Sequence, residues 1–554
     1  MLTNTVINAD QTITFTPNKN ASGEGAFGYA LTDGNIGGES NFTSVAVNIE
    51  PGWGIAEEIY SSKAPIGTVK GAYESDGSLA VVWEQAGLSM VGNYNVIMGQ
   101  RFEKGVWSKG EILSEDYVQG SAHLRALCVL NNDILSIVYY QESISTSSRG
   151  LWSNLYLHDN VNSWSGPKYG NSQKAVEQAS CTNGEFVGLD VSAVLITEPF
   201  QIVTYSPVKL WYTMDRQFDS CYDPIGSCSE NRKIQVRHTT KNGDIILVFF
   251  VEFSFSQSSI WFKRFVNGAW QLATNLEVTL ENEVVPSNST FSSDDNYASL
   301  VEDDKGNLTV FWSRNENPSD NTETWSLWTN RYDVVKGWGV AKPISMGMNN
   351  RARLSKAVAD KDGDLTVVWP EYNYVNGQVS GVELWSKRYN SETDEWVELQ
   401  RLDNENLGIV GNFDLVVDSS KKVSLSWTQQ NGENTEIWFR QYLDGNWTLE
   451  EEIPFAEIGN NYTLITMTSY ETGGVTLYWK QYPTTKLSEQ SYWSSHYIVG
   501  TWTKPTKAAS QYNRTSFSPI LLKRQNWNDT YIVKYTQDLG DGSTEYSIWM
   551  NDHR

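Results

Sequence analysis

The sequence predicts an all-β protein built from repeated antiparallel units, and three observations carry this prediction. Large aromatic residues recur along the chain at intervals of 44 to 66 residues. Short runs of alternating polar and apolar residues, typical of strands, lie between turns rich in Gly, Asn and Asp. A run of about 18 apolar residues, the minimum for a membrane-spanning helix, occurs nowhere.

Three aromatic positions define the repeat from Trp53 onward. The first is followed through nine units, as Trp83, Tyr139, Tyr205, Phe249, Trp312, Trp369, Trp427, Trp479 and Tyr535. The second is Met98 in the first unit and then Trp152, Trp211, Trp261, Trp328, Trp385, Trp438, Trp493 and Trp549. The third is Trp107, Trp164, Trp270, Trp338, Trp396, Trp447 and Trp502. Because two strands precede a Trp-marked third strand and another Trp begins a fourth, each unit predicts a four-stranded antiparallel propeller blade.

The two ends of the repeat region predict how the ring closes. The chain ends at residues 547–554 in a third strand that has no fourth, whereas residues 52–59 form a fourth strand that has no third. We therefore predict a closed β-propeller in which the N-terminal strand completes the last blade and leaves no exposed sheet edge. The count of nine units predicts nine blades, and the irregular third unit keeps eight as the alternative.

Two polar and aromatic patterns are assigned to the scaffold. The recurrent Trp residues are predicted to form the core between blades. Two residues after the second-strand aromatic lies a polar side chain, which stands on the same strand face and favours hydrogen bonding between blades. These polar residues are Gln85, Gln141, Arg314, Glu371, Gln429, Gln481 and Gln537.

Residues 1–50 differ from the repeat region. They contain short alternating strands at 11–17, 25–34 and 44–49. Their pattern resembles the C-terminal half of the cadherin-like tandem repeats of large bacterial surface adhesins. The resemblance implies that residues 1–50 are the remnant of a stalk repeat and that residues 51–554 are the propeller. It also implies a fragment of a longer exported protein, either secreted or displayed on a bacterial cell surface.

The repeat itself also has relatives. Its motif, Asp-x-Asp-Gly-x-Leu-x-Val-x-Trp followed by Ile/Leu-Trp-x-x-Arg-Tyr and Gly-Trp-Gly, resembles Trp-rich repeats of exported bacterial proteins. This resemblance covers residues 52–554 and implies the propeller fold without implying a function.

The net charge of the chain disfavours some classes of binding partner. The chain has 42 basic and 66 acidic side chains and a net charge of −24. Such a field opposes binding to nucleic acid and to anionic membrane surfaces. We expect a monomer without membrane insertion, whose partner is a glycan or polysaccharide or, as an alternative, a surface protein.

Connections that interrupt the repeat are the candidates for ligand binding, because propeller loops carry function more often than core strands do. They bring aromatic rings, which stack on sugars, next to polar side chains, which bind hydroxyl groups. This combination predicts an adhesin-type head that recognises carbohydrate, with ordinary loop packing as the alternative. The candidate residues are Trp325, Tyr372, Tyr374, Tyr482, Arg314 and Glu371.

An enzyme is the alternative reading. His123 begins the first strand of the second unit, which should line the central channel. A polysaccharide lyase needs a base and a cation to abstract a proton beside a carboxylate. Propeller-type ulvan lyases carry a second histidine near the first and a His-Asn pair, and the sequence has neither. A lyase or glycoside hydrolase with its site at the channel mouth therefore remains an alternative, and a protein-binding platform is a further one. A lone histidine such as His123 often has only a structural role. The candidate set is His123, Tyr117, Arg125, Arg351 and Arg353.

Two further features concern metal and disulfide chemistry. Asp360, Asp362 and Asp364 resemble half of a calcium loop. The same place holds Asp-Gly or Asn-Gly in other units, which favours a hairpin turn. The protein is expected to need no cofactor, and calcium is the one candidate ion. Cys221 and Cys228 are close enough in sequence for a local disulfide, with two buried thiols as the alternative.

Overall fold

The computed structural model describes most of the repeat region and four N-terminal strands. In the described residues every regular element is a strand. These residues contain no helix that is long and apolar enough to cross a membrane. The described residues are 2–7, 13–17, 23–29, 43–49, 57–89, 92–115, 120–129, 135–143, 148–157, 163–170, 178–182, 185–189, 202–205, 208–213, 231–254, 257–266, 269–278, 298–315, 325–345, 350–352, 355–375, 378–397, 399–443, 445–453, 460–470, 474–483, 490–498, 500–510, 514–516, 520–522, 529–539 and 543–552.

The strands of the first part of the chain pair locally. In the N-terminal segment β1 (Leu2–Ile7) pairs with β2 (Ile13–Pro17), and β3 (Gly23–Tyr29) pairs with β4 (Thr43–Ile49). Sheet 1 contains β6 (Ile66–Tyr73), β7 (Leu79–Gln85), β8 (Val96–Glu103), β9 (Val106–Trp107) and β10 (Glu111–Ile112). Sheet 2 contains β11 (Ala122–Val129), β12 (Leu135–Ser143), β13 (Ser148–Leu157), β14 (Ser163–Trp164) and β15 (Lys168–Gly170). Sheet 3 contains β16 (Gln178–Thr182), β17 (Glu185–Leu189), β18 (Ile202–Tyr205) and β19 (Val208–Thr213).

The middle of the chain continues this order. Sheet 4 contains β20 (Asn231–Thr239), β21 (Ile245–Ser254), β22 (Gln257–Val266), β23 (Ala269–Trp270) and β24 (Thr274–Asn275). Sheet 5 contains β25 (Ala298–Glu302), β26 (Leu308–Asn315), β27 (Trp325–Asp333), β28 (Gly337–Trp338) and β29 (Lys342–Pro343). Sheet 6 contains β30 (Asn350–Ala352), β31 (Lys356–Ala359), β32 (Leu365–Val375), β33 (Gln378–Asn390), β34 (Glu395–Trp396) and β35 (Gln400–Arg401). Sheets 5 and 6 are joined by one parallel pair, Trp325 with Arg351.

Three sheets complete the chain. Sheet 7 contains β36 (Val410–Val417), β37 (Val423–Asn431), β38 (Asn434–Leu443), β39 (Asn446–Trp447) and β40 (Glu451–Glu452). Sheet 8 contains β41 (Asn460–Ser469), β42 (Val475–Pro483), β43 (Ser491–Ile498), β44 (Thr501–Trp502) and β45 (Thr506–Ser510). Sheet 9 contains β46 (Arg514–Ser516), β47 (Ile520–Leu522), β48 (Thr530–Asp538), β49 (Thr544–Asp552) and β5 (Glu57–Ser62).

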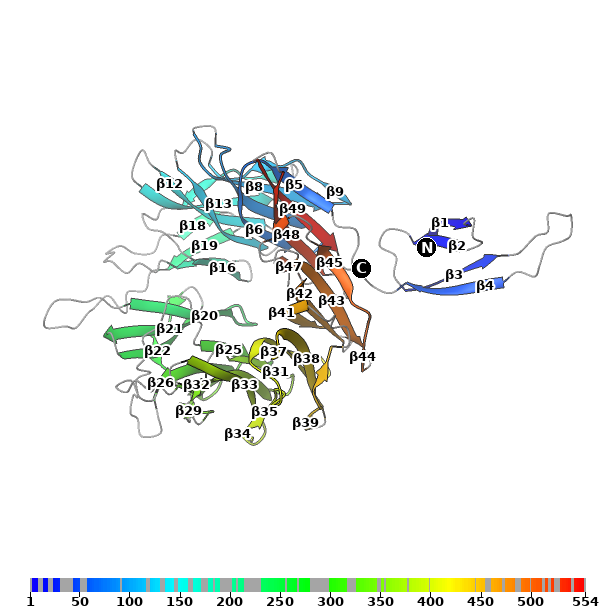
Figure 1. Ribbon diagram of the computed structural model, residues 1–554. Coiled ribbons are helices and arrows are strands. Elements are labelled where there is room, and N and C mark those ends of the chain that lie inside the picture. Colours follow the sequence, from blue (N-terminus) through cyan, green and yellow to red (C-terminus); the bar gives the residue numbers. More distant parts are fainter. Residues whose placement is uncertain are drawn as a thin grey trace.

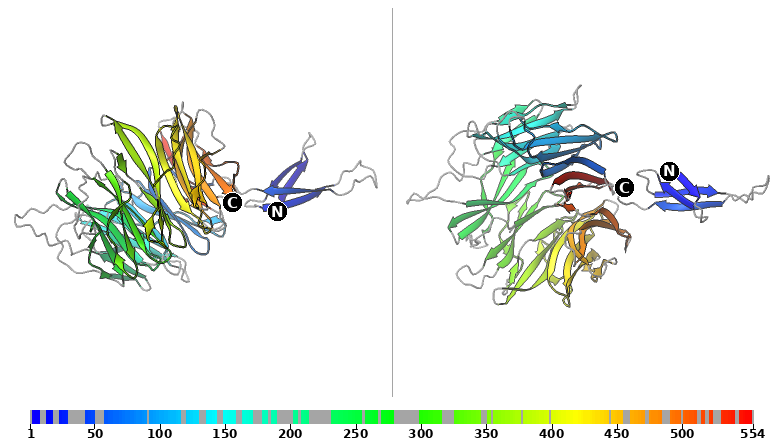
Figure 2. Two further views of the ribbon diagram at one scale, coloured as in Figure 1. Left: turned by 90° about the horizontal axis from the view of Figure 1, so that it is seen from below. Right: turned by 45° about the horizontal axis from the view of Figure 1, so that its top comes forward.

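The sheets follow one another around a common middle, in a propeller-type arrangement (Figures 1 and 2). Their first strands contact one another in sequence order. These contacts join β6 to β11, β11 to β16, β20 to β25, β25 to β31, β31 to β36, β36 to β41 and β47 to β6. The first strands are therefore the innermost strands of their sheets.

Sheet 9 is assembled from both ends of the repeat region. Strand β5 pairs antiparallel with β49, and Tyr60 lies opposite Ile548. The prediction that the N-terminal strand completes the last sheet is confirmed. Tyr60 also packs on Trp83 of sheet 1, with ring centroids 4.8 Å apart, so this strand links the last sheet to the first.

The aromatic repeat forms the core between sheets, as predicted. Trp312 is fully buried and packs with Val248 and Ile260 of the preceding sheet. Each ring buries a large apolar area together with the aliphatic side chains around it, and this burial stabilises the contact between sheets. In seven sheets the first and second repeat positions lie directly opposite each other, in the pairs Trp83–Met98, Tyr139–Trp152, Phe249–Trp261, Trp312–Trp328, Trp369–Trp385, Trp427–Trp438 and Trp479–Trp493.

The repeated glutamine forms hydrogen bonds in three units, and its acceptors lie in the connections between sheets instead of in a neighbouring blade. Its amide nitrogen donates to Ala64 O (3.1 Å) from Gln85, to Glu115 O (2.7 Å) from Gln141 and to Asn404 O (2.8 Å) from Gln429. Each carbonyl lies in the segment that leads from one sheet into the next, so the side chain fixes the position of the following sheet.

One sheet departs from the predicted antiparallel pattern. In sheet 3, β17 and β19 run parallel, with Phe186 opposite Leu210, and β18 lies at the edge. The expectation of a four-stranded antiparallel unit is therefore wrong here. The third unit lacks the third Trp that begins the last strand elsewhere, so the sequence signal for that strand is absent.

A second repeated contact joins neighbouring sheets. Three residues after the second aromatic position, an Arg pairs with an acidic residue of the turn between first and second strands and covers a Tyr ring of the next sheet. We call this Arg–acid–Tyr group the inter-sheet latch. The distances from guanidinium carbon to ring centroid are 3.9 Å for Arg101–Tyr156, 5.8 Å for Arg264–Tyr332, 4.9 Å for Arg331–Tyr389 and 4.2 Å for Arg388–Tyr442.

Candidate functional site

A β-bulge on the innermost strand of sheet 2 sets Arg125 apart from the scaffold. Leu124 pairs with Tyr139 and Ala126 with Val138, which leaves Arg125 as the additional residue. Bulges change the direction of a side chain and are frequent next to functional sites. The first strands of four other described sheets have bulges here, but their additional residues are uncharged: Gly67 and Thr68, Gln235, Gly411 and Asn412, and Ile465.

His123 and Arg125 both lie near the ring of one tyrosine. The His123 ring stacks on Tyr140, with centroids 6.4 Å apart and planes inclined by 24°. The guanidinium carbon of Arg125 lies 5.9 Å from the centroid of the same ring. His123 and Arg125 are half-buried, whereas Tyr140 is buried. The imidazole and the cation are therefore held together by a rigid aromatic support, in a contact that stabilises a cation by about 0.5–2 kcal/mol.

Charged side chains from two neighbouring sheets hold the backbone around this site. The carboxylate of Glu84 in sheet 1 accepts the Leu124 N–H at 2.7 Å. In sheet 9 the Lys534 amine donates to Ile66 O (3.0 Å) and Gly67 O (2.9 Å). Burial lowers the pKa of Lys534, and the Glu84 charge opposes that shift. We call Glu84, His123, Arg125, Tyr140 and Lys534 the central polar cluster.

The chemistry available to this cluster is that of acid recognition and proton transfer. A guanidinium presents paired donors that match a carboxylate or sulfate. An imidazole exchanges a proton near neutral pH. Glu84 and Lys534 bind backbone groups at the two bulges, whereas His123 and Arg125 are partly exposed.

The structure brings together only part of the predicted catalytic set. His123 and Arg125 share Tyr140. Arg351 belongs to β30 in sheet 6, and its side chain lies outside the described residues, as do Tyr117 and Arg353. The sequence prediction missed Tyr140 and Glu84. Each directly precedes one of the repeated glutamines. A charged or phenolic side chain at that position of the repeat was the sequence signal that could have identified them.

Most of the predicted ligand-binding residues belong to the scaffold. Trp325 is only 3% exposed and packs in the core with Trp312. The expectation that its ring is an exposed sugar platform is wrong, because β27 begins there and turns the side chain inward. Glu371 is buried and accepts the Trp369 indole N–H at 3.0 Å. The Arg314 guanidinium covers Trp328, 4.5 Å from the ring centroid.

The remaining tyrosines lie on different sheets. Tyr372 is partly buried against the core between sheets 6 and 7, and Tyr374 is half-exposed further along β32. Tyr482 is half-exposed in sheet 8, with the Lys480 amine 5.5 Å from its ring centroid. The backbone places Arg351 between Trp325 and Tyr372. The described residues therefore show no single site that contains this predicted set.

The three aspartates of the predicted calcium loop do not converge. Asp360 accepts the N–H groups of Asp362 and Asp364 at 3.0 and 3.1 Å, as a hairpin turn requires. Asp362 pairs with Lys421, and Asp364 accepts the Ser391 hydroxyl at 2.9 Å. The described residues contain no cluster of three acidic, His or Cys side chains that could hold a metal ion. Cys221 and Cys228, the predicted disulfide, lie outside the described residues.

Comparison with known proteins yields likeness in structure alone. No protein-family model matches the sequence, and no curated protein matches it. An ulvan lyase of a new polysaccharide lyase family has a TM-score of 0.37 and 10% identity, covering 75% of this chain and 89% of that chain. The polysaccharide lyase Uly1 has a TM-score of 0.36 and 12% identity, covering 88% and 91%.

A third similar structure is the β-propeller domain of the Trilobed protease from Pyrococcus furiosus. Its TM-score is 0.33 and its identity 10%, and the match covers 82% of this chain and 97% of that chain. Likeness at these scores transfers none of these activities to this chain.

Proposed function

We propose that this protein binds acidic polysaccharide at the central polar cluster, on a closed propeller whose nine sheets are its blades. The observation that carries the proposal is the bulge of β11, which makes Arg125 the charged exception among the bulges of the described first strands and sets it beside His123. An acidic sugar supplies the carboxylate or sulfate that a half-exposed guanidinium binds.

The net charge of the chain makes local cations necessary for such a ligand. At −24 the protein repels a polyanion at long range. Binding then depends on short-range pairing with the cluster, and salt screens this pairing much less than it screens the long-range repulsion. Moderate salt is therefore expected to preserve or increase retention of acidic polymers and to leave retention of neutral polymers unaffected.

Cleavage of the bound polymer by β-elimination is the second candidate function. The observation that favours it is the position of an imidazole and a guanidinium on one tyrosine ring. Neutral His123 would take the proton from the carbon next to a uronate carboxylate paired with Arg125. A C=C bond forms as the C–O bond to the leaving sugar breaks, and that oxygen takes up a proton.

Affinity electrophoresis and ultraviolet absorbance separate these two functions. The protein is run through gels that contain uronate-rich, sulfated or neutral polysaccharides, and parallel solutions are followed for unsaturated ends. Binding is supported if an acidic polymer retards the wild type and Arg125→Ala abolishes this retardation. Cleavage is supported if the wild type produces new absorbance and His123→Ala abolishes it as well. His238→Ala is the matched control, because it removes a partly exposed histidine of sheet 4 that pairs with Glu302 of sheet 5. The proposal is overturned if Arg125→Ala is retarded as strongly as the wild type. It is also overturned if no acidic polymer retards the wild type.

We further propose that the propeller is displayed outside the cell by a stalk of which residues 1–50 are part. The support is the adhesin-like pattern of this segment, whose described strands pair with one another. Antibodies against sheets 1–9 are expected to label intact cells of the source organism. Labelling only after the cells are broken would contradict the proposal.

A further inference from the structure

A second group of polar contacts lies on the innermost strands of sheets 6, 7 and 8. The Lys356 amine of β31 pairs with Asp414 of β36 at 2.7 Å and lies 5.7 Å from the ring centroid of Phe413. The other carboxylate oxygen of Asp414 accepts the Met467 N–H at 2.7 Å and the Thr466 hydroxyl at 2.8 Å. We call these five residues the second polar cluster.

The second polar cluster shares two features with the central polar cluster. In each, a cation lies near an aromatic ring, with distances to the ring centroid of 5.9 Å in the central cluster and 5.7 Å in the second. In each, a carboxylate of the preceding sheet accepts a backbone N–H of a bulged first strand, Glu84 for β11 and Asp414 for β41. The cation belongs to the bulged strand in the central cluster and to sheet 6 in the second.

The two cations lie at equivalent depths of their strands. Lys356 lies opposite Val368, and Arg125 directly precedes the residue that lies opposite Val138. Val368 and Val138 are equivalent, because each comes one residue before the first aromatic position of its sheet. Sheets 3, 4 and 5 come between sheets 2 and 6 in one direction, and sheets 7, 8, 9 and 1 in the other (Figure 1). Lys356 and Arg125 therefore lie across the common middle from each other.

The Lys356 side chain runs along the inner edge of sheet 7. Asp414 contacts sheet 8, whereas its neighbours Phe413 and Leu415 pack against sheet 6. One edge of β36 pairs with β37, so Lys356 reaches Asp414 past the opposite edge of the strand. That edge borders the common middle, where a polymer would pass.

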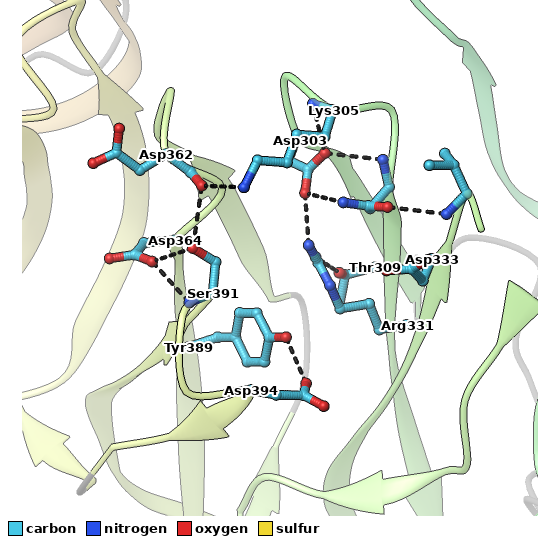
Figure 3. A network of polar contacts seen from close by, with 12 residues as sticks. Asp303, Lys305, Thr309, Arg331, Asp333, Asp362, Asp364, Tyr389, Ser391 and Asp394 are labelled. Atoms are coloured by element: carbon cyan, nitrogen blue, oxygen red, sulfur yellow. Dashed lines mark hydrogen bonds and ion pairs between the residues drawn. The ribbon is translucent and has the colours of Figure 1, made fainter. Parts of the chain in front are cut away.

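Lys356 is more exposed than the cations that join sheets. Its side chain is 47% exposed. In the latch shown in Figure 3, Arg331 is 19% exposed and pairs with the fully buried Asp303. Within the described residues the Lys356 amine donates one hydrogen bond, to Asp414. An ammonium group has three donors, so this amine has donors left for an anion.

We propose that Lys356 is a second binding position for the same acidic polymer; this rests on the proposed binding at the central polar cluster. A carboxylate or sulfate on one sugar pairs with Arg125, and an acidic group further along the polymer pairs with the Lys356 amine. Because Asp414 opposes part of the Lys356 charge, this second contact is the weaker one. Two contacts on one polymer nevertheless strengthen its binding, since the second forms at a high effective concentration.

Affinity electrophoresis of two variants tests the second position. The probes are polygalacturonate and dextran sulfate, with dextran as the neutral comparison. Lys356→Ala is expected to weaken binding of an acidic polymer about two- to fivefold, as the loss of an exposed ion pair would. Asp414→Asn is expected to strengthen it, because the change removes the opposing charge and keeps an oxygen that accepts the Met467 N–H. A residue needed only for packing would give no such gain.

A matched ion pair far from the common middle supplies the controls. Lys241 also pairs with an aspartate of the next sheet, Asp304, and both lie in the turns between first and second strands. Lys241→Ala and Asp304→Asn change the net charge by the same amounts as the two test variants, and both are expected to be retained like the wild type. Urea denaturation shows that each variant is folded.

The outcomes separate the second position from the central one. The second position is overturned if folded Lys356→Ala is retained like the wild type while Arg125→Ala is not retained. It is also overturned if Asp414→Asn is retained no more strongly than Asp304→Asn. If no acidic polymer retards the wild type, binding at the central polar cluster is overturned and the second position with it.

Discussion

The grooves between sheets 1 and 2 and between sheets 5 and 6 occupy equivalent places and differ in size. Their volumes are about 340 and 560 Å³. Each is built around a latch, with Arg101 and Tyr156 in the first groove and Arg331 and Tyr389 in the second. The same scaffold therefore produces a tight junction in one place and an open one in another.

The difference lies in a few side chains around the latch. Arg101 pairs with Glu74 and is 6% exposed, whereas Arg331 pairs with Asp303 and is 19% exposed. After the third Trp, Ser108 caps the Arg101 N–H at 2.9 Å. The equivalent Gly339 has no side chain to do so. In both places the latch joins two sheets, and the smaller groove is the one in which a side chain after the Trp binds the backbone of the latch arginine.

Removing the latch arginine is expected to lower the free energy of unfolding more than any other change considered. The loss is expected to be greater for Arg101, in the smaller groove, than for Arg331. Arg101→Leu leaves the fully buried Glu74 carboxylate without its cation, which costs about 3–5 kcal/mol. Arg331→Leu is expected to cost about 1–3 kcal/mol. Asp303 keeps the N–H groups of Lys305 and Asn307, each at 2.9 Å. Urea denaturation measures both, with the exposed Lys109→Leu as control, and equal midpoints for the two variants would contradict the comparison.

Exchanging the residues after the Trp is expected to have an intermediate effect. Ser108→Gly removes an acceptor from the Arg101 N–H and adds backbone freedom, so it should destabilise the protein by about 1 kcal/mol. Gly339→Ser should not destabilise it, because the new Cβ meets its nearest atom, Arg331 O, at 3.4 Å. Thermal melts of both variants decide the matter. A large loss of stability in Gly339→Ser would show that the groove is needed for packing.

A third latch sharpens the role of the acidic partner. Arg388 lies 3.6 Å from Asp360, and burial raises the pKa of that carboxyl. A raised folded-state pKa means that ionisation costs stability above it, and that the cost disappears as pH falls through the folded value. Asp360→Asn keeps the turn acceptor and removes this dependence, so its stability should change by less than about 1 kcal/mol near neutral pH. Denaturation midpoints across mildly acidic pH test this. A variant whose stability still rises on acidification as steeply as wild type would exclude Asp360 as the source.

The smallest effect is expected at the exposed pair of Asp362 and Lys421. This pair lowers the pKa of Asp362, so its contribution exists above the unfolded pKa and is lost as pH falls through the folded one. Exposed ion pairs are screened by water and salt. Lys421→Ala should therefore leave the denaturation midpoint unchanged at physiological salt. A clear loss of stability there would mean that the turns of neighbouring sheets support one another.

Much of the fold could be predicted from the sequence, because each repeated aromatic residue has a local reason for its place. Trp83 and its equivalents follow strand alternation, and the final strand without a fourth predicted the pairing of β5 with β49. The candidate site was predicted only in part. His123 and Arg125 were named, but their contact with Tyr140 depends on a bulge whose position the sequence pattern does not reveal.

The sequence by itself determined the all-β class, the repeat period and the core aromatics. These features depend on alternation along one strand and on spacing within one unit, which are local. Only the tertiary structure decided that Trp325 is buried, that Arg331 covers Tyr389 and that the side-chain amide of Asn330 binds the Leu276 carbonyl of the preceding sheet. Each of these depends on how one sheet packs against the next, and packing joins residues whose sequence separation carries no periodic signal.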